Sequence, residues 1–314
     1  MTRYLTYFLL FIILSTAACK ESGQSNTSTN ENGAQQKLTI VCTTGMIADI
    51  VKNVAGDKAN VQALMGPGVD PHYYKATQGD LKKINGADLI FYNGLKLEGK
   101  MQSVFDKLSK KKKIMAVAGG IPPNDLILID EENHQIVDPH IWFDVALWTR
   151  AVNAVMDKMQ LEDAANKELY AENGKKYLQQ LKELHQKVQR EIATIPDNQR
   201  ILITSHDAFS YMGRAYNLEV DALQGISTVA EFGLKDITNL VNKIVERKIK
   251  SVFIESSVSK KSLEAVVEGC KNKGHEVVIG GTLYSDAMGE EGTPEGTYIG
   301  MVNHNLSTIL NGLK

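Results

Sequence analysis

Two segments of the chain carry the same tripeptide, Asp70-Pro71-His72 and Asp138-Pro139-His140. A proline fixes its own φ and biases the preceding residue towards an extended conformation, so each histidine is presented from a restrained backbone. A neutral imidazole nitrogen is a borderline donor that suits zinc, manganese or iron. A single histidine in a loop is more often an ordinary surface residue, but the repeated tripeptide indicates a shared role for His72 and His140.

Two other polar residues occupy comparable places in the second half of the chain. His206 lies in Ser205-His206-Asp207, directly after an apolar run, and Asp286 lies in a loop nearer the C-terminus. In simpler interpretations Asp207 caps a helix and Asp286 is a turn residue. Each of the four candidates lies far along the chain from the next, which excludes a finger or a loop site formed by one local segment.

The elements that position these residues can be predicted from the apolar pattern. Short runs rich in valine, isoleucine and leucine alternate with segments of helical periodicity, which indicates βαβ units and a parallel sheet. The predicted strands are residues 38–43, 60–65, 87–93, 113–118, 200–204, 218–223, 251–255 and 276–279. The predicted helices are residues 45–54, 77–85, 99–108, 208–216, 235–247, 260–272 and 295–310. Ligands of open α/β sheets bind beyond the carboxyl ends of the strands, which is where the candidate residues fall.

One long helix is predicted between the two halves. Residues 163–195 contain no proline, and apolar side chains recur there in steps of three and four residues, at Leu178, Leu181, Leu184, Val188, Ile192 and Ile195. Gly174 costs about 1 kcal/mol relative to alanine without breaking the helix, and Pro196 ends it. At 1.5 Å per residue the helix would span roughly 50 Å. We interpret it as a stiff spine between two lobes, residues 38–162 and 196–314.

Four segments carry a family resemblance. The string GPGVDPHYYKATQGDLKKINGADLIFYNGLKLE (66–98) resembles the N-terminal lobe of the zinc/manganese solute-binding proteins of bacterial ABC importers. DPHIWFD (138–144), SHDAF (205–209) and LYSDAMG (283–289) are similar to three further stretches of that family, in the same order. The resemblance covers essentially everything after residue 37. It implies an α/β fold of two parallel-sheet lobes, joined by one long rigid helix, with the metal site in the cleft between the lobes.

The resemblance also implies a function and a set of ligands. His72 and His140 from the first lobe and His206 and Asp286 from the second would bind one divalent ion. The protein would capture Zn²⁺ or Mn²⁺ outside the cell and deliver it to the membrane permease of an importer. We expect it to act as a monomer. The formal net charge of −2 and the lack of a basic stripe argue against nucleic acid as a partner.

The identity of the metal stays open between zinc and manganese. Three nitrogen donors favour zinc by the general affinity order of divalent metals. A carboxylate that binds through both oxygens would raise the coordination number towards what manganese prefers. Many zinc-specific relatives carry a histidine-rich loop that is reduced here to His134, and relatives with glutamate in place of His206 resemble manganese carriers. We expect zinc to bind more tightly, with manganese as the alternative cargo.

The remaining candidates have weaker interpretations. Glu255 ends a predicted strand on the cleft side and either supports a ligand or has a structural role. His134 is either a first contact for the metal or a plain loop residue. We assign no function to His185, His275 and His304.

Two other functions are consistent with parts of the sequence. A secreted zinc hydrolase would leave one metal position open for water, whereas a fourth ligand is available here, and the sequence has no HExxH motif. Ser205-His206-Asp207 is not accompanied by a GxSxG elbow, so a serine hydrolase is not indicated either. Surface lipoproteins can also act as adhesins, but no feature of the chain points to a host partner. We therefore predict a binding protein and not an enzyme.

The N-terminal residues are typical of an exported lipoprotein. A basic start, a brief apolar run and small residues over residues 1–18 describe a secretory signal, and the run is too short for a transmembrane helix. Cys19 follows two alanines in a pattern that resembles the lipobox, which implies that Cys19 is acylated and anchors the protein to a bacterial membrane. Residues 20–37 lack large apolar side chains and should form a flexible tether. The distant pair Cys42 and Cys270 implies no disulfide, and we expect both thiols to be free.

Overall fold

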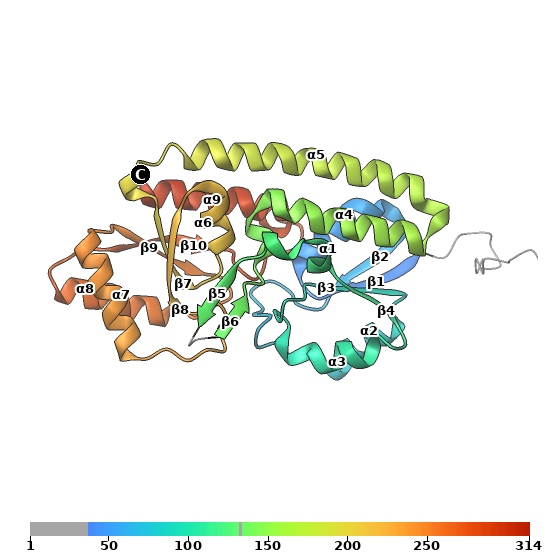
Figure 1. Ribbon diagram of the computed structural model, residues 1–314, viewed down its shortest axis with the longest axis horizontal. Helices are drawn as coiled ribbons and strands as arrows, with labels where there is room; N and C mark the ends of the chain where they lie inside the picture. Colours follow the sequence, from blue (N-terminus) through green and yellow to red (C-terminus); the bar gives the residue numbers. More distant parts are fainter. Residues whose placement is uncertain (1–36, 132–133) are drawn as a thin grey trace, which may run out of the picture. The chain divides into compact units, whose positions relative to one another are not determined.

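The first lobe is organised around a parallel four-stranded sheet. The computed structural model describes residues 37–131 and 134–314, without the side chains of residues 131 and 134. The strands are β1 (Leu38–Cys42), β2 (Ala59–Ala63), β3 (Leu89–Tyr92) and β4 (Lys113–Ala116), in the spatial order β2-β1-β3-β4 (Figure 1). The helices between them are α1 (Gly45–Ala55), α2 (Gln78–Gly86) and α3 (Gln102–Leu108). These seven elements lie where the apolar pattern predicts them, and a capping box between Thr77 and Asp80 sets the start of α2.

The first lobe also contains two elements that the sequence prediction missed. An antiparallel hairpin of β5 (Leu128–Glu131) and β6 (His134–Val137) precedes the second Asp-Pro-His tripeptide. Its four-residue strands are too short for a clear periodic signal. Helix α4 (Val145–Glu162) follows, with Asp144 accepting a hydrogen bond from the Leu147 amide at its start. Its buried residues Trp148, Ala151, Val152, Val155 and Met159 follow helical spacing, so this helix could have been predicted.

The spine helix is α5 (Lys167–Ile192), which is shorter than predicted at both ends. Asp163 ends α4 in a non-helical conformation, with φ −136°, and a 3₁₀ turn (Ala164–Asn166) separates the two helices. The 26 residues of α5 correspond to about 39 Å of helix and not 50 Å. Gly174 has a packing role, because a Cβ there would lie 2.4 Å from Met156 Sδ of α4.

Helix α5 ties the two lobes together along one face. Its buried residues are Tyr170, Gly174, Tyr177, Leu181, Leu184, Val188 and Ile192. The helix contacts α1 and α4 of the first lobe and α9 (Tyr298–Leu313) and α6 (Ser210–Tyr216) of the second (Figure 1). One hydrophobic cluster therefore includes residues of both lobes, such as Ile40 and Ile309. A core shared in this way makes the spine part of the folded body and not a linker.

The second lobe has parallel pairs of strands. Its strands are β7 (Ile201–His206), β8 (Glu219–Gln224), β9 (Ser251–Glu255) and β10 (Val278–Leu283). β7 pairs with β8, β9 pairs with β10, and β7 contacts β9. The connecting helices are α6, α7 (Leu234–Arg247) and α8 (Lys261–Asn272).

Two of the predicted ranges in this lobe are shifted. β10 runs past the predicted end at residue 279, through Gly280 and Gly281, with a register shift at this point. Glycine is a weak strand residue, so the sequence pattern stopped too early there. α9 begins at Tyr298 because residues 294–296 form a 3₁₀ turn and Thr297 caps the helix.

The predicted signal, lipidated Cys19 and nearly all of the tether lie outside the described residues. Within the described range, no helix combines the length and the apolar character needed to cross a bilayer. Cys42 and Cys270 are both buried and free, as the sequence predicts.

Candidate metal centre

The structure brings the four candidate ligands together at the carboxyl ends of strands. His72 follows β2, His140 follows β6, His206 is the last residue of β7, and Asp286 follows β10. One ligand atom from each of the four lies within 4.8 Å of every other. All four side chains are almost completely buried, at 0–4% exposure. A cluster of polar groups at this depth needs partners, because burying unpaired polar groups is unfavourable.

Four of the distances between these atoms are close to those expected around a tetrahedral ion. His72 Nε2 lies 3.3 Å from His140 Nε2 and 3.7 Å from Asp286 Oδ2. His140 Nε2 lies 3.4 Å from Asp286 Oδ1, and His206 Nε2 lies 3.2 Å from Asp286 Oδ2. Four ligands about 2.0–2.1 Å from a central zinc ion would be about 3.4 Å from one another. The side chains therefore surround a space of the size that a divalent metal needs.

Each Asp-Pro-His tripeptide forms the same local turn. Asp70 Oδ1 accepts a hydrogen bond from the His72 amide at 2.8 Å, and Asp138 Oδ1 accepts one from the His140 amide at 2.9 Å. Asp138 Oδ1 also lies 2.8 Å from His140 Nδ1, which leaves Nε2 facing the metal space. The prolines alone do not predict these hydrogen bonds. An aspartate two residues before the histidine is the signal for such a turn, and it could have been used.

His206 is held by Glu255 from the neighbouring strand β9. Glu255 Oε1 accepts hydrogen bonds from the backbone amides of Ser205 at 2.8 Å and His206 at 2.9 Å. Glu255 Oε2 lies 2.5 Å from His206 Nδ1, a close ionic contact without the direction of a hydrogen bond. Because the carboxylate faces Nδ1, the Nε2 atom is the one available to a metal.

The charges of the site depend on Asp286. Burial lowers the pKa of His72 to about 3, so this ring is neutral. Burial also opposes charge on His140 and His206. For His140 the carboxylates of Asp138 and Asp286 outweigh burial and raise the pKa to about 9. Glu255 and Asp286 likewise hold the pKa of His206 well above its usual range. Burial disfavours a charged Asp286, but His206 and His140 outweigh it and hold the Asp286 pKa well below its usual range.

Several atoms of the site are unpaired. His206 Nε2 and both carboxylate oxygens of Asp286 are buried and have no hydrogen-bond partner among the described residues. A divalent cation would satisfy all three atoms at once, which is the fit expected for a bound metal.

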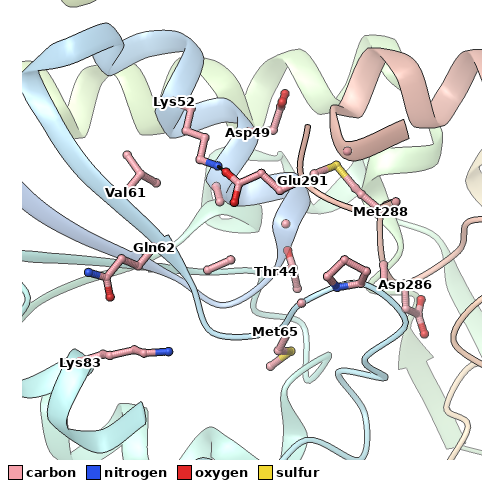
Figure 2. A pocket seen from close by; sticks show the side chains of 18 residues that line it. Thr44, Asp49, Lys52, Val61, Gln62, Met65, Lys83, Asp286, Met288 and Glu291 are labelled. Atoms are coloured by element: carbon pink, nitrogen blue, oxygen red, sulfur yellow. Dashed lines mark hydrogen bonds and ion pairs between the residues drawn. The ribbon is translucent and has the colours of Figure 1, made fainter. Parts of the chain in front are cut away.

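A cavity of about 390 Å³ borders this centre through Asp286. Its walls come from both lobes, with Lys52 and Gln62 on one side and Met288 and Glu291 of the Asp286 loop on another (Figure 2). The metal space thus lies beside a larger open volume.

The other histidines do not join the cluster. His185 Nδ1 lies 3.1 Å from Tyr216 Oη, and His275 Nε2 lies 2.7 Å from the Ile249 carbonyl. His304 Nε2 lies 3.1 Å from the Thr282 carbonyl. These contacts are structural. The side chain of His134 lies outside the described part of the chain, so its suggested role stays a prediction.

Comparison with known proteins assigns the family. The family described as zinc-uptake complex component A, periplasmic, matches residues 40–312, which is most of the chain. The protein belongs to this family. The manganese-binding lipoprotein MntA of Bacillus subtilis is 46% identical over 314 residues, covering 100% of both chains. The zinc-binding protein TroA of Treponema pallidum is 46% identical over 281 residues, covering 89% of this chain and 90% of TroA.

The fold agrees with this assignment. The solved structure of the periplasmic zinc-binding protein TroA from Treponema pallidum matches with a TM-score of 0.86 at 45% identity. The match covers 88% of this chain and 99% of the other. The predicted α/β fold of two lobes and a long helix is therefore confirmed. The two relatives named above are equally similar and carry the names of different metals, so similarity gives no preference between zinc and manganese.

Proposed function

We propose that this protein is the extracytoplasmic substrate-binding component of a metal ABC importer. It captures one divalent transition metal ion with His72, His140, His206 and Asp286 and delivers the ion to a membrane permease. The observation that supports this most directly is the convergence, from two lobes, of three buried ring nitrogens and one carboxylate that lacks a hydrogen-bond partner among the described residues. In this proposal residues 38–162 and 196–314 are the two metal-binding lobes, and residues 163–195 contain the spine.

The arrangement supports binding and not catalysis. A catalytic zinc site has three protein ligands and one open position for water. Here four protein side chains surround the metal space, and none of them is more than 4% exposed. A tetrahedral ion would have no free position for a substrate. The neighbouring groups Asp138 and Glu255 each contact the far ring nitrogen of a ligand histidine, which is a role in orienting ligands.

We propose zinc as the metal that binds most tightly, because three imidazoles and one carboxylate suit zinc. One observation favours manganese as an alternative cargo. Both oxygens of Asp286 face histidines of the site, Oδ1 towards His140 and Oδ2 towards His206. A carboxylate in this position is able to bind through both oxygens and to provide a fifth donor atom, as manganese prefers.

The location that we propose is supported by the N-terminal sequence and by the names of relatives. Its relatives include proteins named as lipoproteins and as substrate-binding proteins of metal ABC transporters. In our proposal Cys19 carries the lipid, and the protein acts as an anchored monomer on the outer side of a bacterial membrane. A Cys19→Ser variant should fold normally but lose the acyl mass and partition into the aqueous phase on detergent extraction. Wild-type protein without acyl mass on Cys19 would contradict the anchor and leave the metal site untouched.

The decisive experiment measures the metal directly. Protein purified without added metal is analysed for its elements, and then titrated with Zn²⁺ and Mn²⁺ under anaerobic conditions. We expect one ion per chain and displacement of Mn²⁺ by Zn²⁺. Growth of a deletion strain in metal-depleted medium then tests the cargo. Rescue by manganese and not by zinc would overturn the zinc assignment, and failure to bind either ion would overturn the proposed function.

A further inference from the structure

The loop that carries Asp286 joins β10 to α9 and covers residues 284–297. Its first residue, Tyr284, exchanges two hydrogen bonds with the Asn305 side chain of α9, at 2.9 and 2.7 Å. The next residue, Ser285, has its hydroxyl 3.0 Å from that of Ser257. The carboxylate of Asp286 itself has no hydrogen-bond partner within the described chain. The second lobe therefore holds residues 284 and 285 by hydrogen bonds, and it contacts the Asp286 carboxylate through His206 Nε2 at 3.2 Å.

Trp142 of the first lobe contacts this loop at both ends. It lies two residues after His140, and its ring is centred 5.3 Å from the His140 ring. Its indole Nε1–H donates a 3.0 Å hydrogen bond to the carbonyl of Ser285, immediately before Asp286. Its backbone carbonyl accepts a 2.7 Å hydrogen bond from the hydroxyl of Tyr298, immediately after the loop. One residue thus links a first-lobe ligand to both ends of the loop that bears the second-lobe carboxylate.

From these contacts we infer that Trp142 is a positioning residue for the metal site, which holds Asp286 in register with His140 across the cleft. The inference rests on the proposed ligand set. A buried indole N–H needs a partner, so the bond to Ser285 favours one arrangement of the two lobes. Metal sites require ligand atoms to be placed within a few tenths of an ångström. A displacement of the Ser285 carbonyl would move the adjacent Asp286 out of this range.

The middle of the loop meets the first lobe through other contacts. It borders the cavity of about 390 Å³ that Figure 2 shows, and it carries Met288 and Glu291 at the edge of this volume. Glu291 reaches the first lobe through a 2.5 Å ion pair with Lys52, but the two side chains are 86% and 49% exposed. Exposed ion pairs contribute little to stability. Met288 is buried in the same hydrophobic cluster as Trp142, a contact that has no direction. The Trp142 hydrogen bond is directional, and it reaches from the first lobe to the residue next to Asp286.

The chain offers a matched control for Trp142. Trp148 of α4 is also fully buried and stacks on Tyr298, at 5.7 Å between ring centroids. Its Nε1 has no hydrogen-bond partner among the described residues. Trp142→Phe and Trp148→Phe therefore remove a similar buried volume, but only the first removes a hydrogen bond to the Asp286 loop.

The test compares the two variants with wild type loaded with Zn²⁺ or Co²⁺. We expect Trp142→Phe to speed Zn²⁺ dissociation about fivefold, the equivalent of one neutral hydrogen bond. The visible band of bound Co²⁺ should weaken in this variant, because a tetrahedral ion absorbs more strongly than one whose carboxylate ligand is replaced by water at higher coordination. Both variants should lower Tm by similar amounts, because each removes the same buried volume. Trp148→Phe should keep the dissociation rate and the Co²⁺ spectrum of wild type.

Two outcomes would overturn the inference. Equal dissociation rates and equal Co²⁺ spectra for the two variants would show that Trp142 only fills the core. If Trp142→Phe does not fold, Tyr298→Phe can be used, because it removes the hydrogen bond at the other end of the loop. A wild-type dissociation rate in Tyr298→Phe would also overturn the inference. Failure of wild-type protein to bind either ion would instead refute the proposed function, so the two failures are distinguishable.

Discussion

The two lobes hold their proposed metal ligands in different ways. In the first lobe each histidine is fixed by an aspartate two residues before it, within the tripeptide that contains both. In the second lobe His206 depends on Glu255 from the adjacent strand. Asp286 follows Ser285, whose carbonyl accepts a hydrogen bond from Trp142 of the other lobe, and we infer that this contact positions it. The supporting group is therefore a near neighbour in the chain for the first-lobe histidines, a residue of the adjacent strand for His206, and a residue of the other lobe for the Asp286 loop.

This difference indicates how the metal could be captured and released. Each of the three histidines is oriented by a carboxylate of its own lobe. Two of the residues that supply these carboxylates, Asp70 and Asp138, are also bonded to the second lobe, through Thr228 and Tyr211. Asp286 contacts the first-lobe histidines His72 and His140 across the cleft. It also brings the one negative charge that lies against all three imidazoles. Separation of the lobes would therefore remove the carboxylate from the first-lobe histidines and weaken the hold on the ion.

The largest effect is expected from removing a ligand. His140→Ala should weaken Zn²⁺ binding by a hundredfold or more, about 2.7 kcal/mol, because the tetrahedral site loses one of four donors. Alanine at His72, His206 or Asp286 should have an effect of the same order. His275→Ala is the control, since His275 contacts a backbone carbonyl away from the site. Competition titration measures the affinities, and wild-type affinity in His140→Ala would refute the ligand assignment.

The next effect compares the groups that orient histidines in the two lobes. Glu255→Gln retains an oxygen for the Ser205 and His206 amides but places an amide or a neutral oxygen against His206 Nδ1. Asp138→Asn makes the same change at His140. Each should weaken Zn²⁺ binding about tenfold, as is typical when such a partner is altered. Glu264→Gln on α8 is the control. If only one of the two variants loses affinity, the lobes do not rely on these carboxylates equally.

Metal capture should depend on pH through the same carboxylates. His140, with its pKa raised to about 9, carries a proton below that pH, and the metal must displace it. Binding should therefore weaken as the pH falls below 9, by up to about tenfold per unit for each proton displaced. Asp138→Asn should lower the pKa of His140 and flatten this dependence. Calorimetry at pH 8 in buffers of different ionisation enthalpy counts the protons, and wild-type binding without proton release would contradict the prediction.

A smaller effect is expected at a second contact between the lobes. Thr228 Oγ1 of the second lobe donates a 2.6 Å hydrogen bond to Asp70 Oδ2, the carboxylate whose other oxygen holds the His72 turn. Thr228→Val keeps the shape and removes the donor, so Zn²⁺ affinity should fall about threefold to fivefold. Thr238→Val on α7 is the matched control, because its hydroxyl bonds only to the Leu234 carbonyl within its own helix. Equal affinities for the two variants would show that this contact does not couple the lobes.

The smallest effect is expected at the exposed ion pair between Glu291 and Lys52, which lies at the edge of the cavity. Glu291→Gln removes the ion pair with Lys52, in which Glu291 is 86% exposed. Exposed pairs contribute at most about 1 kcal/mol, and often nothing measurable. Zn²⁺ affinity should stay within about twofold of wild type, and any change should disappear at high salt. A tenfold loss would mean that the loop is held at its middle and not at its ends.

Much of the fold was accessible from the sequence, because it depends on local patterns. The alternation of apolar runs and helical segments predicts β1–β4 and β7–β10 with the helices between them. The errors in the predicted bounds of strands and helices also have local causes. Gly280 and Gly281 hid the second half of β10. The predicted spine helix began at Asp163. In the structure Asp163 follows the end of α4, and a 3₁₀ turn over Ala164–Asn166 delays the start of α5 to Lys167.

By itself the sequence determined the chemical types of the proposed ligands, the repeated Asp-Pro-His tripeptide and the presence of a long helix between the lobes. These features depend on residue chemistry and on neighbours a few positions away. Only the tertiary structure decided which groups support the ligands that lack a local partner. Glu255 meets His206 because β9 lies against β7, and Trp142 meets Ser285 because two lobes close on one another. A buried donor or acceptor takes whichever partner the packing brings within about 3 Å, and the pattern of one segment carries no information about that partner.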